Sequence, residues 1–113
     1  NSAGPRLVAT IKTGDGAHAF RNQGNKRDLW VTNRVSNTLS KIDMGTLKVE
    51  AEIRVSGGPD CMDIHSSGKQ LWVTQRWTRS VALVDLDQSK VVKRVMVGKS
   101  PHGVYLHDRA DLL

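Results

Sequence analysis

The sequence predicts an all-β fold built from tandem four-stranded antiparallel sheets, and three observations support this prediction. The stretch "LWVTNRVSNTLSKID" at 29–43 returns 42 residues later as "LWVTQRWTRSVALVD" at 71–85, which indicates a structural repeat. Each repeat holds four short β-rich runs bounded by turn residues. No stretch shows the i, i+3, i+4, i+7 recurrence of an amphipathic helix.

Other landmarks keep the same register, so the repeat does not depend on one matched phrase. The 113 residues contain two whole periods of 42 and most of a third. Three sets of residues are each spaced by 42 positions: Ile11, Ile53 and Val95; Thr13, Val55 and Val97; and Ala17, Pro59 and Pro101.

Each repeat is predicted to form four strands joined by tight turns. In the first complete unit, residues 17–58, the strands are expected at 17–22, 28–33, 38–43 and 48–55, with "NQGNKRD" and "MGT" as turns. In the second unit, residues 59–100, they are expected at 59–65, 70–75, 80–85 and 91–97. The turns there are "SSGK", "RWTR" and "LDQSK".

A four-stranded meander of about 40 residues has the dimension of a β-propeller blade. Strands such as "LWVT" and "VALVD" are apolar on both faces, as expected when each sheet is covered by neighbours on both sides. The segment 8–16 is then predicted to supply the outer strand of a preceding blade, from 8 to 13. The segment 101–113 is predicted to supply the inner strand of a following blade, from 101 to 106. We therefore interpret residues 1–113 as one partial β-propeller domain, an incomplete propeller.

Two and a half blades cannot close a ring, and open blades would leave Trp, Val and Leu side chains in water. We expect the chain to be a fragment whose partners are the remaining blades of a parent propeller. Self-association of identical copies through the exposed blade faces is the alternative. It is less favourable because each junction blade would lack its two middle strands.

Composition restricts the possible partners. Lys and Arg outnumber Asp and Glu by 17 to 11, which gives a net charge of +6 and favours acidic partners such as nucleic acid. The single cysteine, Cys61, has no second thiol with which to form a disulfide or a zinc or redox pair. No apolar run approaches the length of a membrane span.

The phrases "LWVTN", "SNTLSKID", "VEAEIRVSGGPD" and "SSGKQLWVT" resemble the YVTN family of β-propeller repeats over nearly the whole chain, and "VGKSPHGV" at 97–104 fits its blade opening. Trp30 and Trp72 replace the Tyr of that consensus, and Asp60 replaces its His. The resemblance implies about seven blades around a central tunnel, with the "PHGV" strand innermost. It also places the chain in the cytochrome d1-like propeller superfamily and implies an extracytoplasmic location, periplasmic or secreted.

His18, Asp60 and His102 occupy one register position of the repeat. The resemblance implies that they converge at the tunnel mouth, where they are candidate ligand-binding residues. In related haem d1 propellers histidines from such loops approach the haem, and two His with an Asp also suit zinc or copper. The simpler interpretation is that they cap their turns by bonding backbone groups. This interpretation is favoured, so neither a cofactor nor a metal is predicted.

A second set of candidates is formed by Arg34, Arg76, Trp77 and Arg79, which follow the second strand of each unit. An aromatic ring beside cations can hold single-stranded nucleic acid by stacking and phosphate contacts, and one periplasmic relative binds single-stranded DNA. Val35 stands where the first unit would need a matching aromatic. A solvated basic face with a half-buried Trp is therefore the favoured interpretation.

No Ser-His-Asp set, Cys-His pair, Gly-rich phosphate loop or C-x-x-C motif is present in the sequence. Asp43 and Asp85 each end a third strand, and the resemblance implies that they bond the following turn. The predicted function is a non-catalytic binding or scaffold surface for a protein or small-molecule ligand. The alternatives are a haem- or metal-binding oxidoreductase domain of cytochrome d1 type and a single-stranded nucleic-acid binder.

Overall fold

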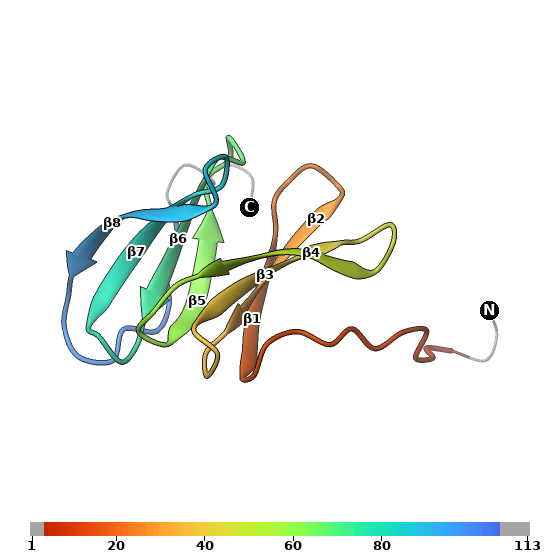
Figure 1. Cartoon of the computed structure of the whole chain (residues 1–113), viewed down its shortest axis with the longest axis horizontal. Helices are drawn as coiled ribbons and strands as arrows, with labels where there is room; N and C mark the ends of the chain where they lie inside the picture. Colours follow the sequence, from red (N-terminus) through yellow and green to blue (C-terminus); the bar gives the residue numbers. More distant parts are fainter. Residues whose placement is uncertain (1–3, 107–113) are drawn as a thin grey trace.

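A computed structural model describes residues 4–106, which form two separate antiparallel four-stranded sheets (Figure 1). Each sheet is a meander in which strands adjacent in sequence are also adjacent in space. The first sheet contains β1 (Ala17–Asn22), β2 (Asp28–Asn33), β3 (Thr38–Asp43) and β4 (Lys48–Arg54). The second contains β5 (Pro59–Ile64), β6 (Gln70–Gln75), β7 (Ser80–Asp85) and β8 (Lys90–Met96).

The predicted all-β class and the two four-stranded meanders are confirmed, and the strand bounds agree with the prediction to within one residue. The turns confirm the role expected for the aspartates that end β3 and β7. Asp43 Oδ1 accepts backbone N–H groups from Gly45 and Thr46 at 2.7 and 3.0 Å. Asp85 does the same for two residues of its own turn. A short carboxylate side chain thus stabilises the same turn in both sheets.

The two flanking segments do not form the strands that were predicted for them. Residues 8–13 run away from the sheets without pairing, and residues 101–106 also form no strand, while 107–113 lie outside the described residues (Figure 1). The physical reason is that a strand needs a neighbour to satisfy its backbone groups. The strands that would pair with these segments are not among the eight described. The pairing of both segments within further blades stays a prediction.

The segment after the second sheet nevertheless lies next to β5 and β6. The hydroxyl of Thr74 donates to the His102 carbonyl at 2.7 Å, and the Leu106 N–H donates to Asp63 Oδ2 at 2.8 Å. These bonds place 102–106 beside the inner strand of the second sheet.

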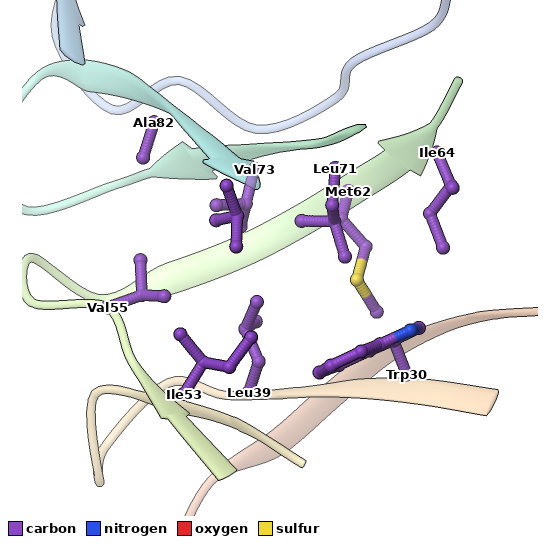
Figure 2. Close-up of a cluster of buried hydrophobic side chains, with 10 residues drawn as sticks. Trp30, Leu39, Ile53, Val55, Met62, Ile64, Leu71, Val73 and Ala82 are labelled. Carbon is purple, nitrogen blue, oxygen red and sulfur yellow. The ribbon is translucent and has the colours of Figure 1, made fainter. Parts of the chain in front are cut away.

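The core lies between the facing surfaces of the two sheets (Figure 2). Trp30 of the first sheet is buried there, and the side chain of Met62 points toward its ring. Complete burial of each such side chain contributes about 1.5–3 kcal/mol, so face-to-face packing is the main force that joins the sheets. The other buried members are Leu39 and Ile53 from the first sheet, Val55 directly after β4, and Ile64, Leu71, Val73, Ala82 and Val84 from the second sheet.

Equivalent residues of the two repeats differ sharply in burial. Ile53 is 2% exposed, whereas Val95, 42 positions later, is 42% exposed. On the opposite side Met62 is 2% exposed and its equivalent Phe20 is 68% exposed. The side chains that form the core between the sheets therefore recur on the two outer faces, where the described residues leave them largely uncovered.

The two sheets are close together at their first strands and diverge toward their last strands. The first strands, β1 and β5, lie closely side by side, whereas the last strands, β4 and β8, make far less contact with each other. Residues at equivalent positions of β1 and β5 are thus brought together at the inner edge of the arc. Within 4–106 there is no helix with the length and hydropathy that a membrane crossing would need.

We expect Gly58→Ala to destabilise the fold by about 1–3 kcal/mol, the range found for strained backbone positions. Gly58 has a φ of +74°, and a Cβ placed there would lie 2.5 Å from Cδ2 of Trp77. Gly98→Ala is the control, because a Cβ at Gly98 would meet no atom within 4 Å. Urea unfolding of both variants measures the effect, and equal stabilities would contradict this account of the turn.

Asp28 links stability to pH. Burial alone raises the pKa of this carboxyl, but hydrogen bonds from Asn25 and Arg27 and the charge of Lys41 outweigh it, so the pKa lies below its ordinary value. Because the folded-state pKa is depressed, the stabilisation is present above the unfolded-state pKa of about 3.9 and is lost as the pH falls through the folded-state pKa.

We expect Asp28→Asn to lower the free energy of unfolding at pH 7, by about 1–3 kcal/mol for lost charged hydrogen bonds. The difference from the parent chain should shrink on acidification below about pH 4, where the parent carboxyl also takes up a proton. Urea unfolding at pH 7 and at a pH below about 4 checks this. Asp87→Asn is the control, because Asp87 is exposed. A difference that does not change with pH would refute it.

Candidate functional site

Two of the candidate residues, His18 and Asp60, lie in β-bulges at the start of the inner strands β1 and β5. In β1, His18 and Ala19 together oppose the single residue Thr32 of β2, because the pairing resumes only at Phe20. The same irregularity recurs in β5 between Pro59 and Met62. A bulge leaves one residue unpaired and redirects the side chains beside it. The side chains at these two bulges therefore do not follow the regular alternation between the two faces of the sheet.

A threonine hydroxyl holds each bulge and ties it to the next repeat. Thr32 Oγ1 accepts the Ala19 N–H at 3.0 Å and donates to the Asp60 carbonyl of the second sheet at 2.7 Å. Thr74, one repeat later, donates to the His102 carbonyl at 2.7 Å. The recurring Thr of "LWVT" therefore fixes the backbone of the candidate residue on the following unit.

The three residues that share one register position converge on a buried carboxylate. Asp60 is completely buried, and its Oδ1 lies 2.9 Å from His18 Nδ1 and 3.9 Å from His102 Nε2. The two histidine rings meet edge to face with their centroids 5.9 Å apart. The structure thus brings His18, Asp60 and His102 into one cluster, which we call the Asp60 cluster.

Arg34 and Arg76 lie in the same cluster, although the sequence suggested a separate surface for them. Nη1 of each guanidinium lies 3.7 Å from Asp60 Oδ2, and both side chains are partly exposed. That oxygen is buried and has no hydrogen-bond partner among residues 4–106. The carboxylate therefore presents Oδ1 to the histidines and Oδ2 to the arginines.

Cys61 is a member of the cluster that the sequence analysis did not select. Its Sγ lies 3.8 Å from Asp60 Oδ1 and 3.9 Å from His102 Nδ1. Burial, together with the negative charge of Asp60 and a hydrogen bond to it, raises the pKa of the thiol. The sequence signal for Cys61 is its place directly after Asp60, whereas a single cysteine has no partner thiol that would mark it as a ligand.

Trp77 and Arg79 lie apart from the cluster, in the turn between β6 and β7. The Trp77 ring packs close to Gly58, and its backbone N–H donates to the Gly57 carbonyl at 3.0 Å. Arg79 is exposed and has a φ of 53°. The predicted nucleic-acid surface is thus divided between two places, and nucleic-acid binding stays a prediction.

The cluster offers donors of three chemical kinds. One ligand atom each from His18, Asp60 and Cys61 lie within 4.8 Å of one another. Imidazole nitrogen, carboxylate oxygen and thiolate sulfur are the usual protein ligands of zinc and related ions. The paired arginines, by contrast, suit recognition of carboxylate or phosphate groups.

Two four-stranded meanders fanned about their inner strands define the class of protein as a β-propeller, seen here as an open arc. The chain belongs to the YNCE-like β-propeller family, and the match to this family covers residues 2–112. The resemblance to propeller repeats noted in the sequence is therefore confirmed.

Solved structures support the same fold. Hydrazine synthase of Kuenenia stuttgartiensis is similar with a TM-score of 0.72 and 24% identity, over 87% of this chain and 28% of that one. Apo AztD of Citrobacter koseri has a TM-score of 0.69 and 15% identity, over 81% of this chain and 26% of that one. The Cps50 (Swd1) β-propeller domain of Myceliophteria thermophila has a TM-score of 0.68 and 21% identity, over 79% of this chain and 27% of that one.

The chain thus spans little more than a quarter of each of these structures. At such identities the likeness shows the fold alone. Comparison with curated proteins finds no match.

We expect Thr32→Val to lower the free energy of unfolding by about 1–3 kcal/mol, because it leaves the buried Asp60 carbonyl without its donor. Valine has nearly the same shape, so the loss reports the hydrogen bond rather than a cavity. Thr46→Val, in an exposed turn, is the control. Urea unfolding measures both, and a Thr32→Val chain as stable as its parent would contradict the role given to the threonine.

Proposed function

We propose that the chain is a non-catalytic binding module of a larger β-propeller, and that it recognises a small anionic ligand at the tunnel mouth through Arg34 and Arg76. One observation carries the proposal. These two guanidinium groups, at equivalent positions of adjacent repeats, both face Asp60 Oδ2 at 3.7 Å and both reach solvent.

Charge and geometry favour an anion at this place. A single carboxylate shared between two arginines leaves one positive charge in excess. A separation of 3.7 Å is an ion pair but is too long for a hydrogen bond. The guanidinium N–H groups are therefore not used up by Asp60. Arginine binds carboxylate and phosphate through two parallel hydrogen bonds, and two arginines from neighbouring blades could hold one such group between them.

A passive role fits the chemistry of the nearby thiol. A cysteine acts as a nucleophile through its thiolate, and the pKa of Cys61 is raised by burial and by Asp60. Its thiol is thus protonated at neutral pH. Cys61 is therefore not activated as a nucleophile, which fits the binding role proposed for the cluster.

The outer faces suggest what completes the module. Val55 is fully buried between the sheets, whereas its equivalent Val97 is 41% exposed. A further blade packed on the second sheet would cover Val97 just as the second sheet covers Val55. We therefore propose that further blades cover these faces, with a second copy of the chain as the alternative. An extracytoplasmic location remains part of the proposal on the strength of the family resemblance.

Titration with inorganic phosphate, followed by NMR of the amide and guanidinium groups, tests the anion site. We expect shifts centred on Arg34 and Arg76, and an affinity at least about tenfold weaker in the Arg34→Gln, Arg76→Gln double variant, since charged hydrogen bonds contribute about 1.5–3 kcal/mol. Lys48→Gln with Arg54→Gln, which removes two exposed charges on β4, is the matched control.

Equal losses of phosphate affinity in the two double variants would show that the effect comes from overall charge, and would overturn the proposal. Quenching of Trp77 fluorescence by a single-stranded oligonucleotide, unchanged in the Arg34→Gln, Arg76→Gln variant, would support the nucleic-acid alternative instead.

A further inference from the structure

We propose that His18, Asp60 and Cys61 form a binding site for a divalent transition-metal ion such as Zn²⁺, with His102 as the fourth ligand. This site uses Oδ1 of Asp60, whereas the anion site proposed above uses the arginines on Oδ2. The inference therefore goes beyond the proposed function and does not depend on it.

The distances between the donor atoms suit one bound ion. Zinc lies about 2.0–2.3 Å from its ligands, so the ligand atoms of a tetrahedral site are about 3.3–3.8 Å apart. Asp60 Oδ1 lies 2.9 Å from His18 Nδ1 and 3.8 Å from Cys61 Sγ. These separations bracket the tetrahedral value, so small side-chain adjustments are sufficient.

His102 completes a four-ligand set. Its Nε2 lies 3.9 Å from Asp60 Oδ1 and 4.0 Å from Cys61 Sγ, so this one nitrogen is near both ligand atoms. The set then contains two imidazoles, one carboxylate and one thiolate. Such a mixture favours zinc or another ion of similar softness over magnesium or calcium, which prefer oxygen ligands.

The surrounding structure prepares the ligands for this role. The bulges in β1 and β5 orient His18 and the pair Asp60 and Cys61 toward the same place. Asp60 is completely buried. Its Oδ1 faces His18, Cys61 and His102, so this oxygen is the one placed to share a cation with them, whereas Oδ2 faces the arginines.

Charge balance determines how the ion would bind. The guanidinium groups of Arg34 and Arg76 lie 3.7 Å from Asp60 Oδ2, and their positive charges oppose an added cation. Binding would therefore replace the S–H bond of Cys61 with a bond between sulfur and metal and release that proton to solvent. The thiolate then offsets one of the two charges of the ion, and the carboxylate of Asp60 is shared between the ion and the two arginines.

Titration of the chain with Co²⁺, followed by competition with Zn²⁺, tests the site. We expect one equivalent of Co²⁺ to produce thiolate-to-cobalt charge-transfer absorption, which Zn²⁺ abolishes. Cys61→Ser should remove that absorption, and both Cys61→Ser and His18→Gln should weaken Zn²⁺ binding at least about tenfold. His102→Gln should weaken it as well. His65→Gln is the matched control, because His65 lies in the turn after β5 and bonds Ser67.

Absence of the charge-transfer absorption in the parent chain, or Zn²⁺ affinity unchanged by Cys61→Ser, would overturn the proposal. An equal loss in His65→Gln would do the same by showing nonspecific binding. Circular dichroism confirms that each variant is folded. The Arg34→Gln, Arg76→Gln variant should bind Zn²⁺ at least as tightly as the parent chain, and Cys61→Ser should keep its phosphate binding, so failure of one site is distinguishable from failure of the other.

Discussion

The packing of one sheet face on the next is the interaction on which the rest of this structure depends. Trp30 and Ile53 of the first sheet are buried only because Met62 and its neighbours in the second sheet cover them. This contact removes Thr32 from water, and in such surroundings its hydrogen bond to the Asp60 carbonyl is stronger than it would be at the surface. Hydrophobic stacking therefore sets the spacing between repeats, and the threonine sets their alignment.

The Asp60 cluster is a consequence of that alignment. Asp60 stands in the second repeat where the first and third have histidine, so one carboxylate is placed between His18 and His102. Asp60 is completely buried; guanidinium groups face one of its oxygens, and the other lies 2.9 Å from the imidazole of His18. The departure from a uniform ring of histidines thus supplies the negative charge around which the donors gather. A strict repeat would have placed only histidines there.

Much of the fold could be predicted from local patterns. The strands were predictable because apolar runs between turn residues reflect each strand's own burial, and Asp43 was predictable as a turn residue because its bonds are local. The segment 8–13 has a strand-like sequence but forms no strand, because strand formation depends on a neighbour. The bulge at His18 was also not predictable, since it arises from pairing two residues against Thr32 on another strand.

The sequence by itself determined the repeat, its period of 42 residues and the common register of His18, Asp60 and His102, because these follow from the order of residues along the chain. The tertiary structure alone decided that Arg34, Arg76 and Cys61 join them. The direction of a side chain across the gap between two sheets depends on bulges and on the stacking of blades. Contacts between residues about 40 positions apart are formed only when hydrophobic burial has brought the sheets together.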